Sequence, residues 1–192
     1  PAMQSGSKVL VFDNQERTRF SLSHQRTQST AVFDSLLARA FVQSSDTAQR
    51  TIEVRGPAQG PALRDGLLTF EQESIGIEGE LRKALGTRTL LTYGGTYQRD
   101  EFDQLRDRSE TVIATGEPVP TSLAFPSKYF PRTDITETGA FAQAELSLWG
   151  GRLAVVPGVR YDRFDLDADQ DDPIFLSGNP GTPTPVDTTE DA

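Results

Sequence analysis

The stretch GAFAQAELSLWGGRLAVVPGVRYDR, residues 139–163, decides the fold, because it contains two alternating runs around a pair of glycines. Gly150-Gly151 predicts a two-residue β-turn, since both central positions of such a turn require a positive φ. We pair Trp149 with Arg152 and count outward along both runs. One face of the resulting hairpin is then apolar or aromatic throughout: Leu148, Leu146, Ala144, Ala142 and Ala140 against Leu153, Val155, Pro157, Val159 and Tyr161.

The other face of this hairpin is mixed and partly charged. A slip of one residue would place Glu145 and Arg160 among the leucines, so the predicted register is well specified. Residues 74–98 show the same division into two faces, with a turn near Gly86. The apolar face of this second hairpin carries Ile75, Ile77, Gly79 and Leu81 beside Leu91, Tyr93, Gly95 and Tyr97.

A third and weaker hairpin precedes these two. Phe20 and Leu22 alternate with polar residues, and a polar turn near residues 28–30 leads into a second run. The apolar positions of that run are Leu36, Ala38, Ala40 and Val42. We therefore predict an all-β chain of about six antiparallel strands in three hairpins.

The connections predict which kind of sheet this is. The three turns lie at one end of the sheet, whereas the segments 46–66, 103–134 and 178–192 are expected to be long connections at the other end. Soluble antiparallel domains mostly have short connections at both ends. Short periplasmic turns and long extracellular loops are typical of outer-membrane barrels, so we predict part of a transmembrane antiparallel β-barrel.

The predicted strand length fits a membrane. A strand over residues 153–164 with a tilt of ~45° spans roughly 26 Å. The outward apolar band of outer-membrane barrels is about 25 Å tall. Trp149 lies at the short-turn end, and Tyr161 and Phe164 lie at the long-loop end, where we expect the aromatic girdles.

The composition excludes several classes of protein. No run approaches the ~18 consecutive apolar residues of a membrane helix. The formal net charge of −9 argues against a nucleic-acid partner, and the lack of cysteine excludes disulfides and thiolate metal sites. Because soluble β-sandwiches also have alternating strands, a soluble β-sandwich binding module stays an alternative.

Four stretches resemble the barrel of TonB-dependent outer-membrane receptors, especially the haem and haemoglobin receptor branch. They are GAFAQAELSLWGGRLAVVPGVRYDRFDLD (139–167), TLLTYGGTYQRDEFDQLRDR (89–108), FPSKYFPRTD (125–134) and ERTRFSLSH (16–24). The resemblance implies a barrel of about 22 strands, closed by an N-terminal plug and driven by the TonB complex of the inner membrane.

The resemblance also implies the organisation and partners of the chain. We expect residues 1–192 to be a partial barrel domain with no plug domain and no signal peptide, since the chain starts at Pro1. The haem ligands of that branch are expected outside this chain, so we expect no cofactor here and a transported ligand that is haem or a ferric siderophore. The expected partners are outer-membrane lipid, the TonB complex through the plug, and a haem-carrying host protein, in the outer membrane of a Gram-negative bacterium.

Three groups of residues are candidates for function. Loop residues on a rigid scaffold often contact ligands, and the expected loop 103–134 offers Lys128, Tyr129, Phe130 and Arg132. Strand parity turns a second set toward the lumen: Glu78, Glu80, Glu145, Arg160 and Asp162. The alternate carboxylates of Asp165, Asp167 and Asp169 could converge on Ca²⁺. The chain lacks the glycine and the glutamate that an EF-hand loop requires at fixed positions, so a solvated acidic loop is favoured.

Other motifs give no support to catalysis. His24 is the only histidine, and its parity places it with Phe20 and Leu22 at the rim of the outward face. Ser5 and Lys8 fit S-x-x-K without its partner motifs, so we expect no enzyme. The remaining alternative within the membrane is a passive porin or adhesin barrel, which would need no plug.

Overall fold

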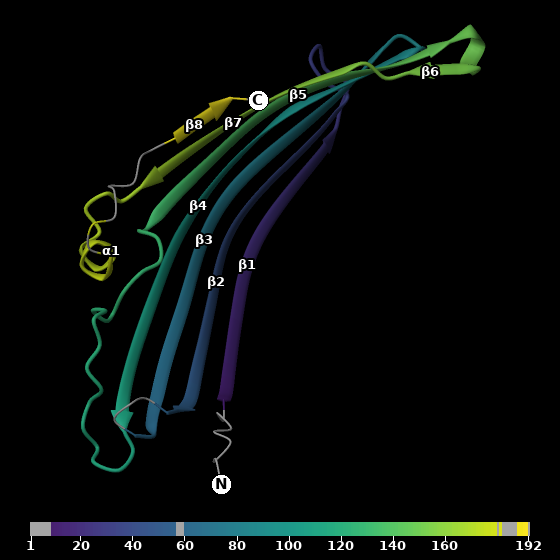
Figure 1. Ribbon diagram of the computed structural model, residues 1–192. Helices are drawn as coiled ribbons and strands as arrows, with labels where there is room; N and C mark the ends of the chain where they lie inside the picture. The colour runs from purple at the N-terminus through teal and green to yellow at the C-terminus, as the bar shows by residue number, and fades with distance from the viewer. Residues whose placement is uncertain (1–8, 57–59, 180, 182–187, 192) are drawn as a thin grey trace.

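The computed structural model describes residues 9–56, 60–179, 181 and 188–191, and most of them form one antiparallel sheet (Figure 1). The strands are β1 (Val9–Thr27), β2 (Ser35–Arg55), β3 (Ala62–Leu85), β4 (Thr89–Val112), β5 (Thr133–Leu148), β6 (Leu153–Val155), β7 (Gly158–Ala168) and β8 (Thr188–Asp191). A single 3-10 turn (Trp149–Gly151) and the short helix α1 (Pro173–Gly178) complete the structure.

The strands follow one another in the sheet in their order along the chain, β1-β2-β3-β4-β5-β7-β8, with β6 also paired to β5. The sheet curves but does not close (Figure 1). Among the described residues no second sheet covers either face. This single curved layer is part of a barrel, as the sequence predicted, and it is not the two-sheet packing of a β-sandwich.

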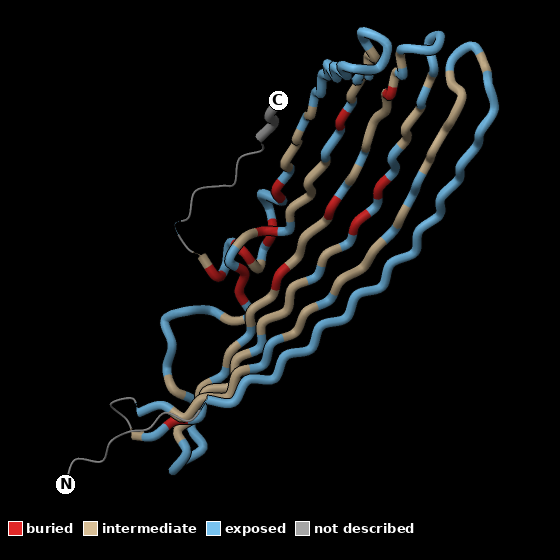
Figure 2. The backbone as a smooth tube through the Cα atoms, turned by 90° about the vertical axis from the view of Figure 1, so that its right-hand side faces the viewer, coloured by how far each residue is buried: buried red, intermediate tan, exposed pale blue. Residues whose placement is uncertain are grey.

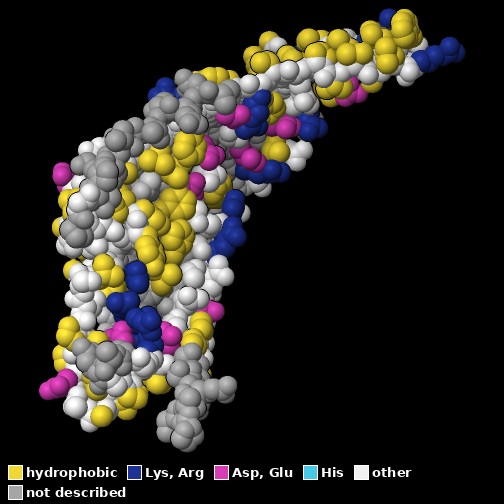
Figure 3. All heavy atoms as spheres, viewed as in Figure 1, with side chains coloured by type: hydrophobic (Ala, Val, Ile, Leu, Met, Phe, Trp, Pro, Cys, Tyr) yellow, Lys and Arg dark blue, Asp and Glu magenta, His cyan; other side chains and the backbone are white. Residues whose placement is uncertain are grey.

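The hairpin over residues 139–163 has the predicted register. Leu146 pairs with Val155, and Ala142 pairs with Val159. The turn differs from the prediction, because it spans residues 149–152 and Trp149 has a positive φ of 49° in addition to the two glycines. Trp149 and Arg152 therefore belong to the turn and do not form a strand pair. Figure 3 shows hydrophobic side chains along the arm that the ends of β5 and β6 form.

Pro157 divides the last predicted strand into β6 and β7. Proline has no N–H to donate to the ladder, so a strand is interrupted where it occurs. The Pro157 carbonyl still accepts a hydrogen bond of 2.9 Å from the Ala144 amide. The register is consequently the same on both sides of the interruption.

The other two hairpins also have the predicted facing residues. Ile77 pairs with Tyr97 across β3 and β4, and Leu22 pairs with Ala40 across β1 and β2. The first turn is longer than expected, because β1 ends at Thr27 and β2 begins only at Ser35.

The strands extend much further toward the long-loop end than the sequence predicted. The segment 46–66 is mostly paired strand, since β2 and β3 pair from Asp46↔Glu71 to Arg55↔Ala62, and only residues 56–61 connect them. β4 likewise continues to Val112, which leaves residues 113–132 as the loop. Alternation of apolar and polar residues predicts a strand only where one face is apolar. Because these extensions carry polar residues on both faces, their sequence predicts a loop.

The two faces of the sheet differ in exposure. Phe20 and Ile77, on the apolar face, are 70% and 56% exposed, whereas Ser74 and Asp100, on the polar face, are 8% and 5% exposed. Side chains on the concave side of a curved sheet converge, so the polar face is the inner wall of the barrel. Figure 2 shows the buried positions along the middle strands and around α1.

The prediction that Phe164 belongs to the outward aromatic girdle is wrong. It lies three residues after Tyr161 on β7, and its cross-strand partner is Glu137. Because side chains alternate along a strand, Phe164 belongs to the inner face and only Tyr161 belongs to the outward face.

Candidate functional site

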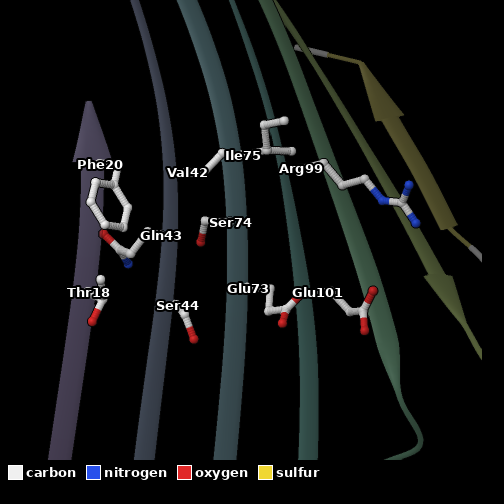
Figure 4. A pocket seen from close by; sticks show the side chains of 10 residues that line it. All are labelled: Thr18, Phe20, Val42, Gln43, Ser44, Glu73, Ser74, Ile75, Arg99 and Glu101. Carbon is white, nitrogen blue, oxygen red and sulfur yellow. The ribbon is translucent and has the colours of Figure 1, made fainter. Parts of the chain in front are cut away.

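The outward face changes from apolar to charged at a sharp boundary (Figure 4). One cross-strand row consists of Phe20, Val42, Ile75 and Arg99. The next row toward the long-loop end consists of Thr18, Ser44, Glu73 and Glu101. A shallow groove of about 470 Å³ crosses this boundary. The apolar band of the barrel therefore ends at the first row on β1, β2 and β3, and one row earlier, at Tyr97, on β4.

The boundary runs obliquely across the sheet. It lies at Phe20 on β1 but at Tyr161 on β7, after which Arg163 is the next outward residue. Tyr161 pairs with Ala140 on β5. The same cross-strand row continues through β4, β3 and β2 and reaches β1 at His24. The boundary thus shifts by four residues, from 20 to 24, across the sheet. Strands that tilt relative to a barrel axis produce such a shift.

The five residues predicted to face the lumen lie on the inner face in the observed register: Glu78, Glu80, Glu145, Arg160 and Asp162. Arg39 Nη1 lies 2.7 Å from Glu78 Oε1, and Arg160 Nε lies 2.6 Å from Asp162 Oδ2. Arg82 similarly pairs with Glu80 at 2.8 Å. At the height of the apolar band, the inner wall thus carries three ion pairs, which water or another protein segment can contact.

The loop 113–132 folds back along β4 beyond the end of β5. Ser127 and Arg106 exchange two backbone hydrogen bonds of 2.8 Å, and the Val119 amide donates to the Glu110 carbonyl at 2.8 Å. The loop thereby pairs with the part of the β4 edge that β5 leaves free. It covers backbone groups that would otherwise form an exposed strand edge.

A buried lysine joins this loop to the helix α1. Lys128 is 7% exposed, and its ammonium lies 2.6 Å from Asp103 Oδ1 and 2.8 Å from Asp172 Oδ2. Burial alone would lower the pKa of Lys128, but the two carboxylates outweigh it and raise the pKa. Asp172 also accepts hydrogen bonds from the Ile174 and Phe175 amides, which caps α1. Lys128 is thus a fold-stabilising residue and not the exposed ligand contact that the sequence suggested.

Two of the other three loop candidates are also engaged with the barrel. The Phe130 ring packs edge-on against Phe70 at 6.4 Å, and Arg132 pairs with Glu101. Tyr129 is 63% exposed and lies against Arg106, 5.0 Å from the guanidinium carbon to the ring centroid. Tyr129 presents its side chain to an open pocket.

That pocket has a volume of about 240 Å³ and includes three arginines that the sequence analysis did not single out: Arg64, Arg106 and Arg108. They lie on the inner face, where β3 and β4 extend beyond the apolar band. Arg64 is paired with Glu110 at 3.1 Å and with Glu53 at 3.7 Å. The alternate spacing of Gln104, Arg106 and Arg108 is the signal in the sequence, but the prediction of a loop over residues 103–134 obscures it.

The acidic candidates and the histidine lie apart from this pocket. In the part of the chain that the structure describes, no three acidic or histidine side chains gather as a metal site would require. Asp165 is instead paired with Arg163 at 3.0 Å. His24 lies opposite Ala38 on the outward face, near the short-turn end.

The family model described as TonB dependent receptor-like, beta-barrel matches residues 4–188. No curated protein matches the chain. Within the described ranges, no helix has the length and hydropathy needed to span a membrane. Given the two-faced curved sheet and this match over nearly the whole chain, the protein belongs to the TonB-dependent receptor β-barrel family, whose members are outer-membrane receptors and transporters of Gram-negative bacteria.

Proposed function

We propose that this chain forms part of the wall of a receptor that imports haem or another iron chelate through the outer membrane, with energy supplied by the TonB complex. The observation that carries the proposal is the two-faced wall. Its outward side has an apolar band with an oblique boundary, and its inner side has paired charges along the same strands.

The length of the strands supports a receptor that captures its ligand outside the membrane. β3 and β4 have 24 residues each. With ~3.3 Å per residue and ~45° tilt, they span roughly 55 Å, about twice the height of the apolar band. The part beyond the band forms one side of an extracellular vestibule, which carries the arginine pocket on its inner face.

Growth on a defined iron source tests the proposal. Cells that lack this receptor should fail to grow on haem or on one ferric siderophore as the sole iron source, and the complete receptor gene should restore growth. Deleting the gene for TonB should abolish the restored growth, because members of this family depend on that coupling. A haem-carrying host protein is a further candidate haem source for the same assay.

A passive channel would give a different result. Growth that is restored by the receptor and unaffected by loss of TonB would contradict energy-coupled import. If growth on every iron source were the same with and without the receptor, iron chelates would be excluded as the cargo.

A further inference from the structure

The pocket between β3, β4 and the loop 113–132 contains two arginines that have no acidic partner. Among the described residues, neither Arg106 nor Arg108 lies within ion-pair distance of a carboxylate, although the chain carries 28 Asp and Glu against 19 Lys and Arg. Most arginines on the same strands of this acidic protein form ion pairs with carboxylates. Two neighbouring guanidiniums that form no such pair are therefore candidates for binding an external anion.

Aromatic rings hold these two arginines in position. The guanidinium carbon of Arg106 lies 5.0 Å from the Tyr129 ring centroid and 5.5 Å from that of Phe125. Arg108 lies 4.7 Å from the same Phe125 ring, and its Nη2 donates a hydrogen bond of 3.4 Å to Thr121 Oγ1. Cation–π contacts occupy the faces of a guanidinium and leave the N–H groups along its edge free for a planar or tetrahedral anion.

The surroundings of Arg108 destabilise its charged form, which a bound anion would stabilise. Burial, together with the nearby positive charges of Arg64 and Arg106, lowers the pKa of Arg108, which lies beyond the apolar band. Arg64 in turn is neutralised by Glu53 and Glu110. An anion at Arg106 and Arg108 would meet two guanidiniums that form no ion pair with the described residues, although Glu110 partly offsets the charge of Arg108 from a greater distance.

The place of the pocket fits a contact with incoming ligand. Arg106 is five residues beyond Glu101 on β4, which corresponds to about 16 Å along the strand above the apolar boundary. The volume of about 240 Å³ is below the ~300–1,000 Å³ of a pocket that encloses a whole small molecule. The pocket can accept one anionic arm of a ligand and not the whole ligand.

We propose that Arg106 and Arg108 bind a carboxylate or another anionic arm of the transported ligand at the entrance of the barrel, with Tyr129 and Phe125 as their aromatic supports. This inference rests on the proposed import function and restricts the cargo to anionic chelates.

The test uses the complete receptor, purified in detergent, and three probes: ferric citrate, haem with its two propionates, and a neutral ferric trihydroxamate. The double variant Arg106→Gln/Arg108→Gln is compared with Arg50→Gln. Arg50 is the matched control, because it lies on the outward face of the same extension and is paired with Asp65 at 2.5 Å. The unfolding temperature of each ligand-free variant is measured as well.

We expect one of the two anionic probes to bind better than the neutral one, with an affinity that falls as salt is added. The double variant should lose at least about tenfold in affinity for it, since each lost charge-assisted hydrogen bond is worth about that factor. Arg50→Gln should bind normally, and the ligand-free double variant should still unfold cooperatively, at a temperature lowered only by the loss of its cation–π contacts.

Three results would overturn the inference. The first is binding and TonB-dependent uptake of the neutral chelate alone, which would leave the import function standing. The second is an unaltered affinity of the double variant for the anionic probe. The third is an equal loss of affinity in Arg50→Gln, which would assign the effect to the overall charge of the receptor and not to this pocket. Binding of none of the three probes would instead reject iron chelates as cargo, and the inference with them.

Discussion

Asp34 fixes the first turn at the short-turn end of the barrel. Its carboxylate accepts hydrogen bonds from Ser29 Oγ at 2.6 Å, from Lys83 Nζ at 2.9 Å and from the Ala84 amide at 2.8 Å. These hydrogen bonds lower the pKa of Asp34 from 3.8 to about 2. Because the folded pKa is depressed, the stabilisation is complete above pH 3.8 and is lost as the pH falls through about 2.

We predict that the barrel loses stability between pH 3.8 and pH 2 partly through this turn. The unfolding temperature of the receptor in detergent, followed by its gel mobility, should fall less over this range in Asp34→Asn than in the wild type. Equal falls in both proteins would show that Asp34 does not contribute to the acid sensitivity.

Two glycines of neighbouring strands allow a closely matched comparison. A Cβ on Gly94 would lie 2.1 Å from the Gly79 carbonyl oxygen and 3.0 Å from the Phe141 ring, whereas a Cβ on Gly79 would meet nothing within 4 Å. We predict that Gly94→Ala lowers the free energy of unfolding by about 1–3 kcal/mol, because a backbone atom must move. Gly79→Ala should change it by less than about 0.5 kcal/mol. Urea unfolding in detergent micelles measures both values, and equal effects would contradict the close approach of β3 and β4.

At the scale of the element, adjacent residues of β5 test which face meets lipid. Ala142 lies on the outward face within the apolar band, and Gln143 lies on the inner face. We predict that Ala142→Arg costs about 2–4 kcal/mol, because a charge on the lipid face must leave water. Gln143→Arg should cost much less, since the inner wall already carries charges. The amount of folded receptor in the outer membrane reports on both, and a larger loss for Gln143→Arg would reverse the assignment of the faces.

The hairpins inside the membrane could be predicted from the sequence, and the extensions outside it could not. Between Ala140 and Tyr161 the residues alternate because lipid faces one side and the lumen the other, and the predicted register is the observed one. Beyond Glu73 on β3, both faces meet water, so the composition no longer distinguishes strand from loop. The pairing of residues 46–55 with 62–71 depends on hydrogen bonds between backbones, which leave no pattern in the side chains.

The candidate site was missed for the same reason. Arg106 and Arg108 belong to an extension that the sequence presented as loop, and their inward parity becomes visible only once β4 is known to continue to Val112. Lys128 illustrates the converse case. A lysine in a polar loop reads as exposed, and its burial follows from its contacts with Asp103 and Asp172, which come from distant segments.

At the scale of the whole molecule, the sheet is a barrel wall with lipid on one side and the aqueous lumen on the other. Residues 1–192 contain no cysteine, so each cysteine introduced among them gives one nitroxide-labelling site in this part of the receptor. Electron paramagnetic resonance of the complete receptor in lipid vesicles then compares collisions with oxygen, which partitions into lipid, and with a water-soluble nickel complex.

We predict an alternation with a period of two along residues 140–161. Outward positions such as Ala142, Val155 and Val159 should favour oxygen, and inward positions such as Gln143 and Arg160 should favour the nickel complex. Equal accessibility to the nickel complex at all of these positions would contradict the membrane-spanning wall.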